Sequence, residues 1–396
     1  MLDKLLDIRN NGRDMNRDSI EGTCEADRYK TCVYFSNWSV YHKKHFVKDI
    51  PAHLVTHIFY AFFKINTHSG AVEYSDSWCD TEMPMELTLK PNSQVRGSLE
   101  QLLELKHTNR HLKVCMSIGG WGAGPAFTEV MRHHKKMTTF VTSCLFLVSK
   151  HKFDGIDIDW EYPQSRGEAN LLVELLHQLR NSADKKFPNA DIQLTIAAPA
   201  GEENISVLDL RSLDKYLSFF NVMCYDFAGS SWSDRTAFHS NLFGGNGDNN
   251  LNCAEVISEY IRGGVKPSKL VFGMPCYGRS FLRTQRPSIG ERFHKGSNGG
   301  NETIDYKDLP LDNNQEYFDY RKISAFSFNP TSGIFVSYDN PQSSRVKAKY
   351  VRLNKLGGGM WWDSSGDAVE KERSLVYAFV SQLGGPKVLD SSRNNV

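Results

Sequence analysis

The chain has 396 residues, and 40% of them are hydrophobic, which is enough to bury a large core. Its 47 Lys and Arg nearly balance its 46 Asp and Glu, so the composition argues against a protein that binds nucleic acid through a basic face. No stretch approaches the ~18 apolar residues of a membrane span, and no Cys or His cluster has zinc-ligand spacing. We therefore expect a monomer without metal, cofactor, membrane span or disulfide framework.

The first 28 residues are polar, mixed in charge and without the apolar segment of a signal peptide. We expect residues 1–28 to be a disordered or loosely attached tail, and residues 386–396 to be a flexible C-terminal tail. In the absence of a visible signal peptide, the sequence predicts a protein that is intracellular or exported by a non-classical route.

Short apolar runs alternate with segments of helical periodicity from Tyr29 onward. The predicted strands are 31–35, 57–63, 112–118, 155–160, 192–198, 219–225, 270–277 and 359–362. The predicted helices are 99–107, 138–150, 169–183, 254–262, 344–353 and 374–383. Near-continuous apolar strands are typical of a sheet buried on both faces. Eight of them alternating with helices predict an α/β fold, a (β/α)8 TIM barrel over residues 29–385.

One interval breaks this alternation. Residues 281–337 separate the seventh predicted strand from its helix and contain turns and short strand-like runs. We expect a small α+β insertion on the rim of the barrel. A wall beside a functional site is one interpretation of this insertion, and a decorative loop is the other.

The fourth strand carries three acids in alternation, within the segment FDGIDIDWEYP at 153–163. Side chains of a strand alternate between its faces, so Asp157, Asp159 and Glu161 point into the barrel. Burying three acids is costly, because charges that leave water need partners and like charges disfavour joint ionisation. The useful consequence is a shared proton, which keeps one carboxyl protonated near neutral pH.

Position along the strand separates the roles of these acids. Glu161 stands last, at the C-terminal mouth where active sites of barrels lie, so we predict that it is the proton donor. Asp159 is one step deeper and is expected to orient a group beside it. Asp154 has the opposite parity and opens the strand, which predicts structural support.

This pattern resembles glycoside hydrolase family 18, the chitinase family. The signature D-x-x-D-x-D-x-E matches Asp154, Asp157, Asp159 and Glu161 without a gap. Further segments match in the family's order: SIGGW at 117–121, MCYD at 223–226, MPCYGR at 274–279 and GGGMWW at 357–362. The resemblance covers residues 29–383 and is strongest to the fungal enzymes. A sporulation-type or intracellular yeast chitinase is the narrower expectation.

The resemblance implies an endo-type chitinase, which hydrolyses the β-1,4 linkages of chitin and chitooligosaccharides. Family 18 is an exception to catalysis by two flanking carboxylates, because the acetamido oxygen of the substrate attacks the anomeric carbon and the anomer is retained. Glu161 would protonate the leaving oxygen and then activate water. Asp159 would hold the acetamido N–H and stabilise the oxazolinium ion, and Asp157 would pair with Asp159 when that residue turns inward. Tyr225 would hydrogen-bond the acetamido carbonyl.

The resemblance also implies residues that bind the sugar at subsite −1. Asp226 would contact this distorted sugar, Met223 would pack nearby, and Trp362 would lie under it. The spacing supports part of this, because Met223 and Tyr225 share one face of their strand, as do Met360 and Trp362. A role as core filler is the alternative for Trp362.

The remaining candidates lie around this group. Ser117, near the end of the third strand, can reach Asp157. Trp121 would stack on a sugar at the leaving-group side, with a packing role as the alternative. Phe62, Tyr41 and Arg279 are weaker candidates for substrate binding.

Two other functions share this fold. A chitin-binding lectin typically lacks the acid at the position of Glu161, whereas Glu161, Asp159 and Tyr225 are all present here. An endo-β-N-acetylglucosaminidase acting on N-glycans shares the chemistry, but the insertion and the matches at Trp121 and Trp362 favour chitin. The fungal enzymes usually carry a signal peptide, so the family by itself would suggest a secreted or cell-wall protein.

Overall fold

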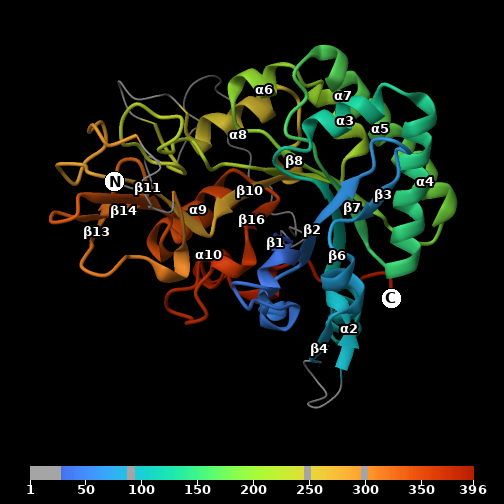
Figure 1. Cartoon of the computed structure of the whole chain (residues 1–396), viewed down its shortest axis with the longest axis horizontal. Coiled ribbons are helices and arrows are strands. Elements are labelled where there is room, and N and C mark those ends of the chain that lie inside the picture. The colour runs from blue at the N-terminus through green and yellow to red at the C-terminus, as the bar shows by residue number, and fades with distance from the viewer. Residues whose placement is uncertain (1–27, 87–93, 245–250, 296–301) are drawn as a thin grey trace, which may run out of the picture.

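The computed structural model describes residues 28–86, 94–244, 251–295 and 302–396 (Figure 1). The tail predicted for residues 1–28 therefore lies outside the described residues, apart from Arg28. In the part of the chain that is described, no helix is both long and apolar enough to cross a bilayer.

Eight parallel strands close into a barrel, as predicted. In spatial order they follow β1-β16-β10-β9-β8-β7-β6-β2, and β2 returns to pair with β1. Their bounds are β1 Lys30–Ser36, β2 His57–Ile65, β6 Lys113–Gly119, β7 Gly155–Asp159, β8 Gln193–Ala198, β9 Phe219–Val222, β10 Leu270–Pro275 and β16 Gly358–Trp362. Each coincides with a predicted strand to within a few residues, because the apolar runs of this sequence are buried on both faces.

Helices surround the barrel on its outer side (Figure 1). They are α2 Gly97–Thr108, α3 Gly124–Met131, α4 His134–His151, α5 Arg166–Lys186, α6 Glu202–Ser206, α7 Leu210–Tyr216, α8 Cys253–Arg262, α9 Pro341–Leu353 and α10 Leu375–Leu383. Side chains of Ser165, Asn252 and Asn340 accept hydrogen bonds from the first turns of α5, α8 and α9. The helices therefore begin directly after these capping residues. The apolar periodicity of the sequence does not mark these starts, because it begins only with the first apolar residue.

Alternation along the strands produces two separate apolar regions. Side chains inside the barrel form one cluster, which includes Tyr34, Phe59, Met223 and Met360. Side chains of the opposite parity, such as Trp361, belong to the larger cluster between strands and helices. The interior is therefore a packed core and not a pore.

The insertion is a five-stranded antiparallel sheet, in the order β12-β11-β15-β14-β13. Its strands are β11 Tyr277–Phe281, β12 Thr303–Asp305, β13 Gln315–Asp319, β14 Ser324–Asn329 and β15 Ile334–Tyr338. Two expectations need correction. The strand predicted at 270–277 is divided between β10 and β11, so the sheet begins before residue 281. The described residues of the insertion contain a 3-10 turn, Tyr306–Asp308, but no α-helix.

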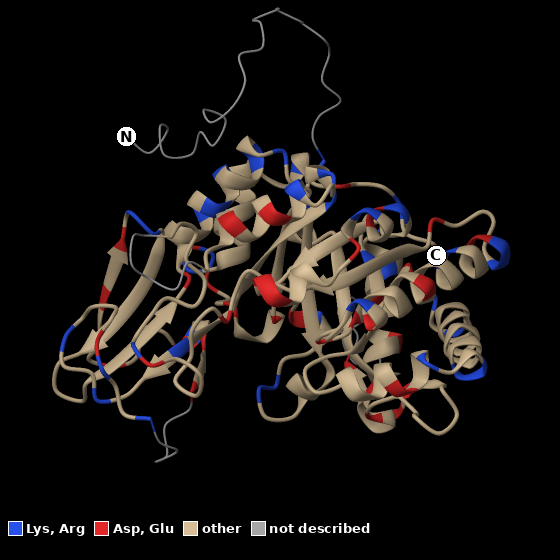
Figure 2. Cartoon of the chain, turned by 90° about the horizontal axis from the view of Figure 1, so that it is seen from above, with Lys and Arg blue, Asp and Glu red and all other residues tan. Residues whose placement is uncertain are grey.

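The insertion sheet stands to one side of the barrel in both views (Figures 1 and 2). Lys and Arg are interspersed with Asp and Glu over the chain in Figure 2, which agrees with the balanced composition. Three short strands complete the fold: β3 Val72–Tyr74 pairs with β2, and β4 Pro84–Glu86 pairs with β5 Gln94–Arg96.

Residues 386–396 do not form the flexible tail that we predicted. They run across the N-terminal end of the barrel, where Leu389 pairs with Tyr29. The buried amide of Asn394 donates to the carbonyls of Lys106 and Leu112, at 3.0 and 2.9 Å. The segment is polar, so its composition resembles that of a free tail, but its hydrogen bonds are made to distant backbone that local sequence does not reveal.

Candidate active site

β7 ends at Asp159, two residues before Glu161, and Asp157 is the most enclosed of the three acids. Its Oδ2 accepts hydrogen bonds from Ser117 Oγ at 2.7 Å and from Tyr34 OH at 2.9 Å, and its Oδ1 accepts one from Thr195 Oγ1 at 2.6 Å. Burial raises the pKa of Asp157, and the three hydroxyl groups oppose this rise. Because these partners come from β1, β6 and β8, the orientation of the Asp157 carboxyl is fixed by three neighbouring strands of the barrel.

Asp159 and Glu161 have far fewer partners. Asp159 is 3% exposed, and its Oδ1 has no hydrogen-bond partner among the described residues. Burial, followed by the charges of Glu161 and Asp157, raises the pKa of Asp159 well above its usual value. Burial also raises the pKa of Glu161, against a hydrogen bond with Tyr162 that lowers it. The charge of Glu161 raises the pKa of Asp159, so the presence of both carboxyls favours retention of a proton at this site.

Glycines after β6 allow other groups to approach the end of β7. Gly119 has φ +115°, and a Cβ there would lie 2.2 Å from the carbonyl oxygen of Asp159. Gly120 has φ +90°, and its Cβ would lie 2.6 Å from the ring of Phe62. The N–H of Gly120 also donates to the Asp159 carbonyl at 3.0 Å. The two glycines of the SIGGW segment are therefore required by close packing and by backbone conformation.

Aromatic rings gather beside these carboxyls. Trp362 stacks on Phe62, with centroids 5.5 Å apart and planes 18° apart, and it also contacts Tyr34 and Trp38. Trp362 is half-buried at the end of β16, which does not fit a core filler. Trp38 is 46% exposed and was missed by the sequence analysis. It directly follows the first strand, and this position at the active end of a barrel was the available signal.

Met223 and Tyr225 lie on the same side of the chain, as their spacing predicted. β9 ends at Val222, but Met223 N still donates to the Ala198 carbonyl at 2.9 Å, and both side chains pack in the interior cluster. Burial, followed by the charges of Asp159 and Glu161, raises the pKa of Tyr225 well above its usual value. Its hydroxyl therefore remains a neutral hydrogen-bond donor near the two carboxyls.

Asp226 is held by the insertion sheet. Its Oδ1 accepts hydrogen bonds from Tyr277 OH at 2.7 Å and from Arg279 Nε at 2.8 Å, and its Oδ2 accepts one from Arg279 Nη2 at 2.8 Å. Burial alone would raise the pKa of Asp226, but His239 and Arg279 hold it well below its usual range. Arg279 thus reaches the site through Asp226, while its guanidinium lies 4.8 Å from the ring of Trp232.

Two further predicted residues, Trp121 and Tyr41, differ in their surroundings. Trp121, on the loop after β6, is 85% exposed, so a packing role is excluded for it. The hydroxyl of Tyr41 donates to Asp76, and its ring packs against the cluster outside the barrel. The structure therefore does not bring Tyr41 to the carboxyls, because the chain turns away in a 3-10 helix, Asn37–Val40, before reaching it.

Asp154 lies at the opposite end of the strand. Its Oδ2 pairs with Lys106 Nζ at 2.7 Å and accepts from Val114 N at 2.8 Å, and its Oδ1 accepts from Asn395 N at 2.7 Å. Both side chains of the ion pair are 1% exposed. These contacts match the structural support predicted from the parity of Asp154.

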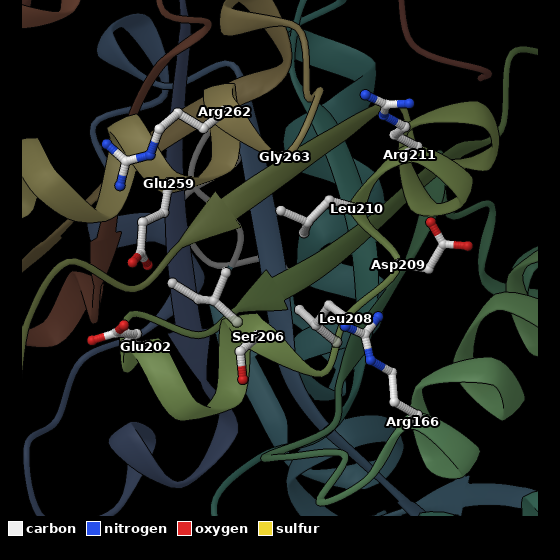
Figure 3. Close-up of a pocket in the computed structure, with 11 residues that line it drawn as sticks. Arg166, Glu202, Ser206, Leu208, Asp209, Leu210, Arg211, Glu259, Arg262 and Gly263 are labelled. Carbon is white, nitrogen blue, oxygen red and sulfur yellow. The ribbon is translucent and has the colours of Figure 1, made fainter.

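A separate pocket of about 420 Å³ lies outside the ring of strands, between α6, α7 and α8 (Figure 3). The carboxyl groups of Glu202 and Glu259 face one another there (Figure 3). Burial and the charge of Glu202 raise the pKa of Glu259. The pocket contains no residue of the predicted site. In the described residues, no group of three or more His, Cys, Asp or Glu side chains could hold a metal ion.

Comparison with known proteins shows a family match and several relatives that resemble this chain in sequence and fold. The model of glycosyl hydrolases family 18 matches residues 30–367. The chain is 37% identical to the sporulation-specific chitinase 2 of Saccharomyces cerevisiae, over 88% of this chain and 76% of that protein. It is 35% identical to endochitinase 1 of Metarhizium robertsii, over 95% and 90% of the two chains. The catalytic domain of the psychrophilic chitinase B from Arthrobacter TAD20 superimposes with a TM-score of 0.84 at 25% identity, over 93% and 99%.

Proposed function

This chain belongs to glycosyl hydrolases family 18, and from that membership and the geometry on β7 we propose that it is an endo-type chitinase with substrate-assisted catalysis. The observation that carries the mechanism is the pair Asp159 and Glu161. Both have raised pKa values, and Asp159 Oδ1 has no partner among the described residues.

The arrangement of the acids favours attack by the substrate itself. A glycosidase with a protein nucleophile needs two carboxyls on either side of the scissile bond, about 5 Å apart. Asp157 and Asp159 lie on β7 and Glu161 follows two residues after its end, so all three acids approach the site from one segment of the chain and leave no carboxyl for the opposite side of the bond. The nucleophile is then the acetamido oxygen of the sugar at subsite −1, which forms an oxazolinium ion.

Each acid has one task in this reaction. Burial raises the pKa of Glu161, which favours its role as the acid: it gives its proton to the leaving glycosidic oxygen and then takes one from the incoming water. The free Oδ1 of Asp159 accepts the acetamido N–H, and, with the reacting proton on Glu161, the Asp159 carboxylate stabilises the positive charge of the oxazolinium ion. Asp157, held by three hydroxyl groups, supplies a carboxyl of fixed orientation one step deeper than Asp159.

The remaining groups place the sugar. The Tyr225 hydroxyl is a neutral donor for the acetamido carbonyl. Asp226 is fixed by Arg279 and Tyr277 for contact with the sugar ring. The exposed part of Trp362 offers a flat apolar surface beneath that ring.

The structure also bears on the two alternatives. A lectin gains nothing from a buried carboxyl pair with raised pKa values, because holding such groups costs stability. An endo-β-N-acetylglucosaminidase would use the same carboxyls. Trp38, Phe62 and Trp362 lie in mutual contact, with ring centroids 5.5 to 6.3 Å apart, and this aromatic surface favours the flat sugar rings of chitin over a branched glycan.

The test is an NMR time course on freshly cleaved chitin tetramer. We expect the β-anomer first, because attack by the acetamido oxygen and then by water inverts the anomeric centre twice. Fully deacetylated chitosan oligomers should bind without being cut. Initial α-anomer, or similar rates on the deacetylated oligomers, would disprove substrate assistance. Release of glycans from a glycoprotein, without cleavage of the tetramer, would favour the N-glycan activity.

A further inference from the structure

A buried imidazole approaches Asp226 Oδ1, the oxygen that also accepts from Arg279 Nε and Tyr277 OH. His239 lies between β9 and α8, is 0% exposed, and has its Nδ1 3.6 Å from Asp226 Oδ1. Its carbonyl accepts from Phe227 N at 3.1 Å, and its N–H donates to Ser337 Oγ at 3.2 Å. His239 is thus attached both to the residue after Asp226 and to β15 of the insertion.

The ring of His239 is in an unusual environment for a core residue. Neither ring nitrogen has a partner at normal hydrogen-bond distance among the described residues, and burying an unpaired polar group costs free energy. The charged and titratable groups around the ring are Asp226, Arg279, Asp339 and Tyr277. Of these, Asp226 approaches a ring nitrogen, at 3.6 Å. An apolar side chain would fill the space without this cost, so the imidazole points to a contact with Asp226.

The charge state of the ring fits this contact. Burial lowers the pKa of His239, although the Asp226 carboxylate opposes the shift. The neutral ring has one N–H and one lone pair. With its proton on Nδ1 it directs a donor at Asp226 without adding a second cation beside Arg279. It can therefore restrict the orientation of the carboxylate without changing the net charge of the pair.

We infer that His239 is a positioning residue for the sugar-binding carboxylate of Asp226. His239 Nδ1 restrains this carboxylate from the loop after β9, while Arg279 and Tyr277 hold it from the insertion. The inference rests on the proposed role of Asp226 at subsite −1. His239 is fully buried and acts on the reaction only through Asp226.

Three substitutions of His239 separate hydrogen bonding from packing. His239→Asn keeps an N–H near the position of Nδ1, His239→Gln moves it toward the position of Nε2, and His239→Leu removes it. We expect the Asn variant to keep most of the kcat on chitin tetramer. The Gln and Leu variants should lose about 10- to 100-fold in kcat, because a misplaced contact group costs up to that order, while KM changes less than about threefold.

His57→Asn is the matched control. His57 is also 0% exposed and also has an unpaired ring nitrogen, Nε2, but it opens β2 at the other end of the barrel. This variant should melt at a lower temperature with an unchanged kcat per folded molecule. It measures what the loss of a buried imidazole does to stability alone.

The outcomes distinguish this inference from the proposed function. If the Leu variant keeps its kcat within twofold of wild type, or if Asn and Leu lose equally, His239 only fills space and the inference is overturned. If the Leu variant does not fold, the comparison of Asn with Gln decides. If wild type cleaves no chitin tetramer, the proposed function itself fails.

Discussion

The two ends of β7 carry the same kind of side chain in opposite circumstances. At the N-terminal end, Asp154 has an ion pair with Lys106 and two backbone N–H partners. At the C-terminal end, Asp159 has an oxygen without a partner among the described residues, and its pKa is raised. The N-terminal end of the strand therefore contributes to the stability of the fold, whereas the C-terminal end carries a buried carboxyl that lowers this stability and is available for the reaction. Maintaining the fold and performing the reaction fall to opposite ends of one strand.

The largest expected effect is on the rate, at the C-terminal end. Glu161→Gln removes the proton donor, and we expect kcat to fall by about 10² to 10⁴, the usual contribution of general acid–base catalysis. Binding of chitin tetramer and the melting temperature should be preserved. Glu202→Gln, in the pocket outside the strands, is the control and should keep full activity. Activity of the Glu161→Gln variant above a tenth of wild type would contradict the assignment of the acid.

The N-terminal end should respond in stability instead. Asp154→Ala leaves the buried ammonium of Lys106 without its carboxylate, which typically costs about 3–5 kcal/mol in the free energy of unfolding. Urea unfolding measures this loss, and kcat per folded molecule should stay near wild type. The exposed pair Asp234–Lys295 provides the control, since Asp234→Ala should change stability by less than about 0.5 kcal/mol. If Asp154→Ala lowers kcat strongly and leaves the free energy of unfolding unchanged, Asp154 serves the reaction and not the stability of the fold.

An intermediate effect is expected on binding. Trp362→Ala removes the flat surface beneath the sugar, and aromatic stacking of this kind is worth about 1–3 kcal/mol. Calorimetry with chitin tetramer, in the Glu161→Gln background to prevent cleavage, gives the change in Kd. Tyr320→Ala removes an exposed ring from the insertion and should bind normally. If the Trp362→Ala variant unfolds, the core-filler interpretation is correct.

The smallest effect is a gain in stability. Because the pKa of Asp159 is raised in the folded protein, the folded state holds a proton that the unfolded chain releases above about pH 4. Asp159 therefore destabilises the fold increasingly as pH rises from that value toward the folded pKa. Asp159→Asn should be more stable than wild type at pH 7 and equal to it near pH 4, while losing most activity. Equal melting temperatures at pH 7 would show that the carboxyl carries no such cost.

The alternation of residues along the chain was enough to predict the part of the site that contains the three acids. The orientations of Asp157, Asp159 and Glu161 follow from the alternation of a strand, which is a property of neighbouring residues. The contact between Ser117 and Asp157 also follows, because adjacent parallel strands bring their ends together.

The rest of the site depends on contacts between distant segments. Asp226 is held by Arg279, 53 positions later, and Asp154 is held by Asn395, 241 positions later. Loop conformation and sheet packing determine such pairs, and neither has a periodic signal in the sequence. For this reason the sequence did not predict the contact of Tyr41 with Asp76, the position of His239 beside Asp226 or the contact of Trp38 with Trp362.

The closure of the barrel has a consequence for the nascent chain. Val33 of β1 pairs with Trp361 of β16, which the ribosome adds 328 residues later. At typical speeds of synthesis this interval is about 15 to 65 s, during which β1 has one unpaired edge. An open edge is a template for pairing with another chain, so the newly made protein is exposed to aggregation until its last strand emerges. Chaperones that cover strand edges should therefore matter more for its yield than for its final stability.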